Sequence, residues 1–312
     1  MNFLNLNYFI TVAEEKSFTG AAKKLYISQQ SLSRHIAKLE DEFGVILLNR
    51  TQPLSLTEAG EALYRSARAI LDQKTQAEKS LQDFRDFRHG SLTIGIPLTR
   101  GTVILPEILP AFHKAFPQIR LNLKEGTTRE INAALYAGET DLNIGFSLGD
   151  PEHVTEEHLY TERLMAAFPR SLLPLLPASR RELLIPGSLQ RFEVFEGCPF
   201  LRMPKGYWLR TLFDNCCEAH GMYPEIVLET ASMASLVALC RAGLGVILLP
   251  ATFVEHGTLF GGRTAVRDEV IIVKLDYPAG SRDVTINYLK DRYLSRAARE
   301  LIRIAREKLV RP

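Results

Sequence analysis

Polar and basic side chains crowd one face of a predicted helix near the N-terminus of this chain. Glutamine can bond bidentately to adenine, arginine to guanine, and serine to a phosphate or a base edge. The candidate DNA-contacting residues lie on this face and in the segments before and after the helix. They are Lys23, Lys24, Ser28, Gln29, Gln30, Ser31, Ser33, Arg34, His35, Lys38, Arg50 and Pro53. Any solvated helix face also looks polar, so the helix alone leaves base reading and simple solvation equally open.

Three short helices are predicted to position this face. Apolar residues at helical spacing indicate a first helix around 6–13, and Ser17 and Ser28 are candidate N-caps of the second and third. The inner stripe of the third helix consists of Leu32, Ile36 and Leu39. Stripes this close together can be buried only against each other, so the third helix presents its polar face to solvent. Its N-terminal residues are then those that reach base edges in helix-turn-helix docking.

A short hairpin predicted after the third helix favours the DNA interpretation. The helix ends in an acidic run, and we expect Phe43 to return to the core. Residues 47–50 and 54–56 can then pair around Thr51-Gln52-Pro53 as a wing. This wing places Arg50 against a phosphate or the minor groove of double-stranded DNA.

The order of residues in this segment resembles the N-terminal pattern of the LysR-type transcriptional regulators. The matching residues include Ser17-Phe18, Ala21-Ala22, Ser28-Gln29, Leu39-Glu40, Leu56-Thr57 and Ala59-Gly60. Two departures are visible: Gln30 replaces a proline common in the family, and Leu48 replaces a phenylalanine. The first puts the docking of the helix start and the sequence preference in doubt. The second changes only the volume of a core position.

A long helix is predicted from residue 58 to about residue 88, with no proline and, after Gly60, no glycine. A stripe recurs every seven residues at Leu63, Ile70, Ala77 and Phe84, extended by Leu81 and Phe87. Such a stripe is best buried against a copy of itself, with packing against the same chain as the alternative. We therefore expect a homodimer through 58–88 and a near-palindromic promoter site. The resemblance implies the same dimer and, commonly, a homotetramer; it leaves RNA polymerase open as a further partner.

After His89-Gly90 the pattern changes to alternating strands and helices, which indicates parallel sheets with crossover helices. The predicted strands are 91–96, 119–125, 141–146, 164–168, 225–229, 246–249 and 284–288, and the predicted helices are 104–116, 128–137, 207–220, 233–242 and 295–309. His153 and His158 are expected in a solvated loop, because their spacing on an acidic stretch matches no defined metal-ligand motif.

This part resembles the effector-binding part of the LysR family, which is similar to a periplasmic binding protein with two α/β lobes. The resemblance is carried by Gly138–Asp141 and Ala242–Val246. The expected fold is therefore α/β, with an all-α winged helix-turn-helix N-terminal domain and a periplasmic-binding-protein-like two-lobed C-terminal domain. The expected domains are a DNA-binding domain at 1–57, a linker and dimerisation helix at 58–89, and an effector-binding domain at 90–312, with lobe 1 at about 90–162 and 268–312 and lobe 2 at about 163–267.

An effector cleft is expected at the carboxyl ends of the strands, where ligands of doubly wound sheets bind. The candidate effector-binding residues are Leu98, Thr99, Arg100, Gly101, Thr102, Thr127, Thr128, Arg129, Ser147, Arg202 and Met203. Helix N-termini together with these hydroxyls and guanidinium groups favour a small anionic effector such as a carboxylate. The competing interpretation is that the arginines are solvated loop residues.

Composition excludes several classes of function. The net charge is +2, from 38 Lys+Arg and 36 Asp+Glu, which argues against a protein that coats nucleic acid over its whole surface. Four cysteines are too few for a disulfide framework, no secretory signal is visible, and no apolar stretch is long enough to span a membrane. We expect a cytoplasmic protein that needs no metal or cofactor, has no membrane association, and carries no catalytic motif.

A ligand-responsive, sequence-specific regulator is the leading hypothesis, and two alternatives remain beside it. A redox-sensing regulator of the same family would use Cys198, although a buried cysteine is usually inert. A solute-binding protein would share the second part of the fold, but the DNA-reading module argues against it. A metabolic enzyme is a poorer third, because no catalytic set stands in a motif context.

Overall fold

A computed structural model describes residues 1–51, 53–86, 90–255, 269–277 and 280–310, without the side chains of 82–86. The chain divides into two compact units, Met1–Arg85 and Asp86–Pro312, and each is described by itself. Gln52 of the predicted wing and Phe87 of the predicted stripe lie outside the described residues, as does the side chain of Phe84.

The first unit begins with three helices, α1 (Phe3–Glu15), α2 (Phe18–Lys24) and α3 (Gln29–Phe43). Both predicted caps are confirmed: the Ser17 hydroxyl accepts from the Gly20 N–H, and the Ser28 hydroxyl accepts from the Ser31 N–H. The residues that close the core between these helices are Phe9, Leu32, Ile36 and Leu39, all fully buried. The polar face of α3 is therefore directed outward, as the stripe predicted.

A wing follows α3, formed by β1 (Leu48–Asn49) and β2 (Ser55–Leu56) in an antiparallel pair. The prediction that Phe43 returns to the core was wrong, because 44% of this residue is exposed. Leu47 and Leu48, each 1% exposed, fill the core beside the wing instead. Leu47 and Leu48, at the start of the wing, therefore complete the core, and the end of α3 remains at the surface.

Helix α4 (Glu58–Asp86) divides the predicted stripe into two parts. Leu63 and Ile70 pack with Leu6 and Ile10 of α1, so this half is partly buried within its own chain. Further along α4, Ala77 is exposed and Leu81 is 65% exposed. Among the described side chains of the stripe, Ala77 and Leu81 are therefore the ones most accessible to a partner.

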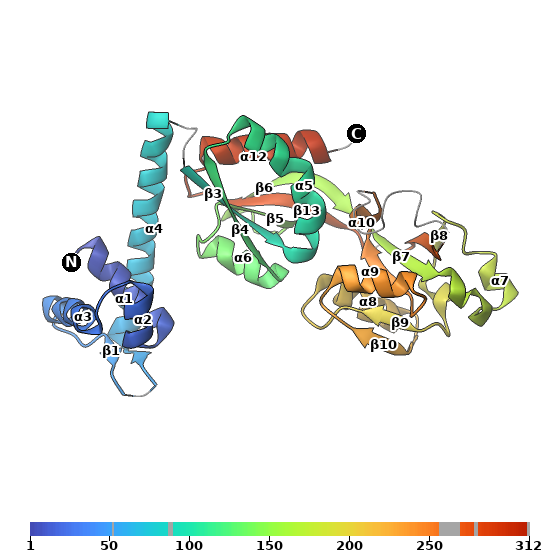
Figure 1. Ribbon diagram of the computed structural model, residues 1–312, viewed down its shortest axis with the longest axis horizontal. Coiled ribbons are helices and arrows are strands. Elements are labelled where there is room, and N and C mark those ends of the chain that lie inside the picture. The colour runs from blue at the N-terminus through green and yellow to red at the C-terminus, as the bar shows by residue number, and fades with distance from the viewer. Residues whose placement is uncertain (52, 87–89, 256–268, 278–279, 311–312) are drawn as a thin grey trace. The chain divides into compact units, whose positions relative to one another are not determined.

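Among the described residues, five strands form the first sheet of the second unit. They are β3 (Gly90–Pro97), β4 (Ile119–Gly126), β5 (Leu142–Phe146), β6 (Val154–Glu162) and β13 (Arg282–Leu289), in the order β4-β3-β5-β13-β6. Strand β3 is parallel to β4 and β5, whereas β13 is antiparallel to β5 and β6, so the sheet is mixed. Helices α5 (Leu98–Ala115) and α12 (Arg296–Leu309) cover one face and α6 (Thr128–Tyr136) the other (Figure 1).

Two predictions about this sheet were wrong. The segment expected as a solvated loop around His158 is strand β6, which pairs with β13 along its length. Helix α5 starts at Leu98, directly after β3, and not at residue 104. Pro97 supplies an extended residue before the helix, which lets the helix begin without a connecting loop.

The second sheet has the order β11-β7-β12-β8 and is also mixed. Its strands are β7 (Leu164–Pro169), β8 (Leu189–Gln190), β11 (Ile247–Pro250) and β12 (Val270–Leu275), with β9 (Phe200–Arg202) and β10 (Ile226–Glu229) as a parallel pair beside β11. The connecting elements are η1 (Arg170–Leu175), α7 (Ala178–Arg181), η2 (Phe192–Phe195), α8 (Trp208–Ala219), α9 (Met233–Arg241) and α10 (Ala251–Glu255).

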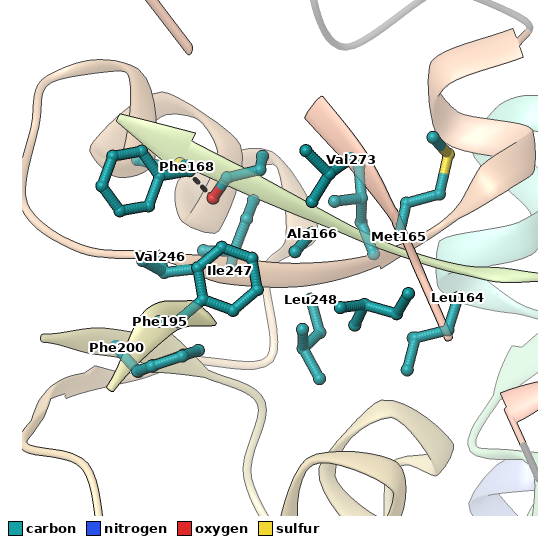
Figure 2. Close-up of a cluster of buried hydrophobic side chains, with 14 of the residues drawn as sticks. Leu164, Met165, Ala166, Phe168, Phe195, Phe200, Val246, Ile247, Leu248 and Val273 are labelled. Carbon is teal, nitrogen blue, oxygen red and sulfur yellow. Dashed lines mark hydrogen bonds between the residues drawn. The ribbon is translucent and has the colours of Figure 1, made fainter. Parts of the chain in front are cut away.

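The core of this lobe lies where β7, β11 and β12 meet the aromatic residues of η2 and β9. Figure 2 shows Phe168, Phe195 and Phe200 packed beside Val246 and Ile247, and all five are fully buried. Strand β12 pairs with β7, so residues 270–275 belong to the second lobe. The expected start of the returning lobe 1 segment at residue 268 was therefore too early.

Candidate functional site

The outer face of α3 is accessible over most of its length. Gln29, Gln30, Arg34 and Lys38 are exposed, while Ser31 and Ser33 are half-buried beside them. The first two belong to the first turn of α3, where side chains reach base edges in helix-turn-helix docking. The polar side chains predicted for the outer face of this helix are therefore exposed or half-buried.

The basic residues around this face fall into two groups. Lys23, Arg34 and Lys38 form no ion pair with any residue that the structure describes. The Lys24 ammonium lies 2.6 Å from the Glu15 carboxylate, and this hydrogen bond raises the pKa of Lys24. The unpaired three are therefore the cations whose charge is fully available to a nucleic acid.

His35 is tied to α1. Its Nδ1 lies 2.8 Å from Asn5 Oδ1, and its ring meets Tyr8 edge to face at 4.9 Å. This arrangement fixes α3 against α1 through a polar contact at the margin of the candidate reading face. One ring nitrogen is thereby occupied within the unit.

Glu40 organises the wing, and the sequence interpretation missed its role. Its Oε1 accepts the backbone N–H groups of Leu47 and Leu48 at 2.9 and 3.3 Å. Its Oε2 accepts from the Arg50 guanidinium at 2.9 Å. An acidic residue in the last turns of a helix opposes the helix dipole, and that mismatch is the signal that could have identified it. Arg50 and Pro53 themselves are exposed on the wing.

The second unit contains a cleft at the carboxyl ends of its strands. One wall comes from the first residues of α5 and α6 and the ends of β5 and β6, and the other from the segment before α8 and the start of α10. The lining residues are Pro97, Leu98, Thr99, Arg100, Gly126, Thr127, Thr128, Phe146, Glu162, Met203, Gly206, Tyr207, Trp208, Leu209, Pro250, Thr252 and Phe253. The cavity measures about 50 Å³, room for a few water molecules.

The structure brings together only part of the predicted effector set. Leu98, Thr99, Arg100, Thr127, Thr128 and Met203 line the cavity, whereas Gly101, Thr102, Arg129, Ser147 and Arg202 do not. Because α5 starts at Leu98, its next turn carries Gly101 and Thr102 to a separate surface groove. The Ser147 hydroxyl donates to Glu156, and Arg202 pairs with Glu229.

Sequence reasoning missed the aromatic and acidic lining. Phe146, Tyr207, Trp208 and Phe253 give the cavity an aromatic surface, and Glu162 adds a carboxylate. Strand β6, which carries Glu162, was not predicted as a strand, so its end was not considered. The other lining residues come from segments distant in sequence, and no local pattern marks them.

Arg100 is the most unusual group in the cleft. It is 8% exposed, makes no hydrogen bond or ion pair with the described residues, and its Nη1 is fully buried. Its guanidinium carbon lies 4.2 Å from the centre of the Phe146 ring, and that of Arg282 lies 4.6 Å from the same ring. Burial, with a smaller contribution from Arg100, lowers the pKa of Arg282. A buried guanidinium normally has hydrogen-bond acceptors, so Arg100 is poised to take one from a ligand.

Glu162 faces the same cavity and is 2% exposed. Its Oε1 accepts from the Thr252 N–H at 3.2 Å and its Oε2 from the Thr252 hydroxyl at 2.7 Å. Burial raises the pKa of Glu162, opposed by these hydrogen bonds and by the charge of Arg100. The nearby Tyr160 hydroxyl is buried without a hydrogen-bond partner among the described residues.

The cysteines are poorly suited to redox sensing. Cys198 is 1% exposed, and burial raises its pKa to about 11. Burial likewise raises the pKa of Cys216 and Cys240 to about 12 and that of Cys217 to about 11. Peroxide reacts with the thiolate, which is a minor form at neutral pH for all of these groups.

His153, directly before β6, and His158, within β6, each lie beside an acidic side chain. His153 Nδ1 lies 2.9 Å from Asp150, and His158 Nε2 lies 3.4 Å from Asp283. In the part of the chain that the structure describes, no group of three or more His, Cys, Asp or Glu side chains could hold a metal ion. Within the same part, no helix is both long and apolar enough to cross a membrane.

Comparisons with known proteins agree with this arrangement. Residues 3–61 match the family model "Bacterial regulatory helix-turn-helix protein, lysR family", and residues 85–310 match "LysR substrate binding domain". The "Hydrogen peroxide-inducible genes activator" of Dickeya chrysanthemi is 30% identical over 317 residues, which cover 99% of this chain and 98% of that protein.

Two solved structures share the fold. A full-length OxyR variant from Pseudomonas aeruginosa has a TM-score of 0.69 at 24% identity, with 100% of both chains covered. Full-length CbnR complexed with its target DNA has a TM-score of 0.63 at 22% identity, with 99% of this chain and 100% of that chain covered. The chain therefore belongs to the LysR family of DNA-binding transcriptional regulators and is not an enzyme.

Proposed function

We propose that this regulator responds to a small anionic metabolite, such as a carboxylate, bound in the cleft between its lobes. The observation that carries the proposal is Arg100, a buried cation beside an aromatic wall that has no acceptor among the residues the structure describes. A ligand carboxylate would supply that acceptor, and the N-termini of α5 and α6 add N–H groups at the same edge of the cleft. Effector binding would shift the balance between open and closed lobes and so alter how the DNA-reading modules sit on a promoter.

Substitution of Arg100 tests the effector site. Arg100→Gln should abolish the transcriptional response to a carboxylate effector identified from a metabolite panel, because the buried cation is removed while a hydrogen-bonding side chain remains. Thr102→Ala is the matched control, since Thr102 lies on the same helix outside the cavity. An unchanged response in Arg100→Gln, with the fold intact, would contradict the proposal.

For the DNA-binding end we propose that α3 reads bases in the major groove and that the wing contacts the backbone through Arg50. The exposed face of α3 and the unpaired cations Arg34 and Lys38 support this assignment. The protein would act as a homodimer through the exposed part of α4 on a near-palindromic site, in the cytoplasm, where bacterial DNA lies. Tetramer formation and contact with RNA polymerase rest on the family resemblance alone.

Protection of the promoter upstream of its own gene, measured over a salt series, tests this assignment. Affinity should fall steeply with salt, because each phosphate contact releases counterions. Arg34→Ala should weaken binding to the protected site more than to a random duplex of equal length. Equal loss on both duplexes would assign Arg34 to phosphate contact, and salt-insensitive binding would contradict the phosphate contacts as a whole.

A redox function has the names of relatives in its favour, but the cysteines of this chain argue against it. The Dickeya relative is named for peroxide induction. In this chain every cysteine has a pKa raised to about 11 or 12 by burial. We therefore place the sensing function at the cleft and not at Cys198.

A further inference from the structure

Two buried groups of opposite charge face one small cavity without pairing with each other. Arg100 and Glu162 both line it and are 8% and 2% exposed. Glu162 directs both carboxylate oxygens to Thr252, while the Arg100 guanidinium makes no hydrogen bond or ion pair with the described residues. A ligand in this cavity therefore experiences a cation that lacks acceptors and an anion that is already hydrogen-bonded.

Arg282 adds a second positive charge beside Phe146. Its guanidinium carbon lies 4.6 Å from the centre of the Phe146 ring, and Phe146 lines the cavity. The guanidinium groups of Arg100 and Arg282 and the carboxylate of Glu162 together give the site a net charge of about +1. In a poorly solvated site, a ligand charge that the protein does not match is strongly unfavourable.

We infer that Glu162 restricts the effector of this cleft to a single negative charge, so that monocarboxylates bind and dicarboxylates of the same length are rejected. The inference rests on the proposed carboxylate site and deepens it. One carboxylate of a ligand would pair with Arg100, and a second one would lie near the Glu162 carboxylate, whose Thr252 donors are already engaged. Rejection by an unfavourable charge is a common way to obtain specificity.

The size of the discrimination follows from Coulomb's law. Two like charges about 10 Å apart in a medium of effective dielectric about 20 repel by about 1.7 kcal/mol. That energy corresponds to more than a tenfold ratio of affinities. Replacing Glu162 with the isosteric glutamine removes the charge and should shift the affinity ratio of a dicarboxylate to a monocarboxylate by about tenfold or more.

Butyrate and succinate are suitable probes, because both have four carbons and differ by one carboxylate. Isothermal titration of the full-length protein should show that butyrate binds more tightly than succinate, and that Glu162→Gln reverses or removes the preference. Glu157→Gln is the matched control, since Glu157 lies on the same strand but its carboxylate pairs with Arg306. Thr252→Val removes a hydrogen bond of Glu162 without altering charge, and it should change both affinities in the same proportion.

The outcomes separate this inference from the proposed function. Butyrate binding that depends on Arg100, together with an unchanged succinate-to-butyrate ratio in Glu162→Gln, would overturn the charge selectivity and leave the anion site in place. Tighter binding of succinate than butyrate by the wild type would overturn it as well. Binding of neither acid at tens of millimolar, or binding unaffected by Arg100→Gln, would overturn the anion site itself. A thermal unfolding curve for each variant checks that the fold is retained.

Discussion

Substitutions at Glu40 should separate two roles of one carboxylate at the base of the wing. Glu40→Ala removes the acceptor of two backbone N–H groups and the partner of Arg50. Arg50→Ala removes only the ion pair. We expect Glu40→Ala to destabilise the N-terminal unit strongly, Glu40→Gln moderately, and Arg50→Ala very little.

The magnitudes follow from burial and geometry. Leu47 and Leu48 are each 1% exposed, so their N–H groups cannot turn to water when Glu40 is removed. Each buried donor left without a partner costs about 1–3 kcal/mol, and the longer bond to Leu48 counts less, so Glu40→Ala should cost about 2–4 kcal/mol. Glutamine keeps a neutral acceptor and should cost about 1 kcal/mol. The Arg50 side chain is 53% exposed, so the ion pair itself contributes at most about 1 kcal/mol.

Urea unfolding of the full chain measures these differences. Far-ultraviolet circular dichroism reports the helices of the N-terminal unit together with the rest of the chain. The single tryptophan, Trp208, lies in the second unit, so its fluorescence gives an internal control. Its transition should keep the same midpoint in every variant.

The relative losses of unfolding free energy in Glu40→Ala, Glu40→Gln and Arg50→Ala test whether Glu40 supports the backbone of the wing. If Glu40→Ala lowers the free energy of unfolding no more than Arg50→Ala does, the carboxylate does not support the backbone of the wing. A shift of the Trp208 transition would show that the effect is not local to the N-terminal unit.

Two further predictions concern the dimer and the thiols. Leu81→Lys should convert the protein to monomers in sedimentation equilibrium, because Leu81 is 65% exposed on the proposed dimer stripe. Thr75→Lys, an exposed position on the same helix, is the control and should leave the mass unchanged. A stable dimer in Leu81→Lys would place the interface elsewhere. Alkylation of the four cysteines should be slow at neutral pH and accelerate about tenfold per pH unit toward pH 11, because burial raises their pKa values and only the thiolate reacts. Rapid oxidation of Cys198 by peroxide at neutral pH would contradict this reading of the thiols.

The N-terminal unit was largely predictable because its signals are local. Ser17 and Ser28 cap their helices within three residues, and the stripe of α3 repeats within a few turns. The prediction for Phe43 was wrong because other apolar residues can fill the same space in the core. Leu47 and Leu48, at the start of the following strand, do so here. The stripe of α4 was ambiguous for a similar reason: α1, folded back from the start of the chain, covers half of it.

The cleft was less predictable because its groups meet only after folding. Arg100 is unusual because its guanidinium is buried against Phe146 in a cavity lined by residues distant in sequence. No sequence pattern near residue 100 indicates either feature. Strand β6 lies at the edge of its sheet and carries acids and a histidine, so the apolar alternation of a strand is weak there. Missing that strand concealed Glu162, which lies at its end.

The place of β13 in the first sheet has a consequence for biosynthesis. This strand lies between β5 and β6, yet the whole second lobe separates it from them along the chain. During synthesis β3, β4, β5 and β6 are made early. Strand β13, which pairs with both β5 and β6, is complete only when Leu289 has been made. The second lobe, whose strands run from Leu164 to Leu275, can complete its own sheet first. The lobe that begins earlier in the sequence is therefore the last whose sheet can be completed, and until then the edges of β5 and β6 that β13 covers stay unpaired.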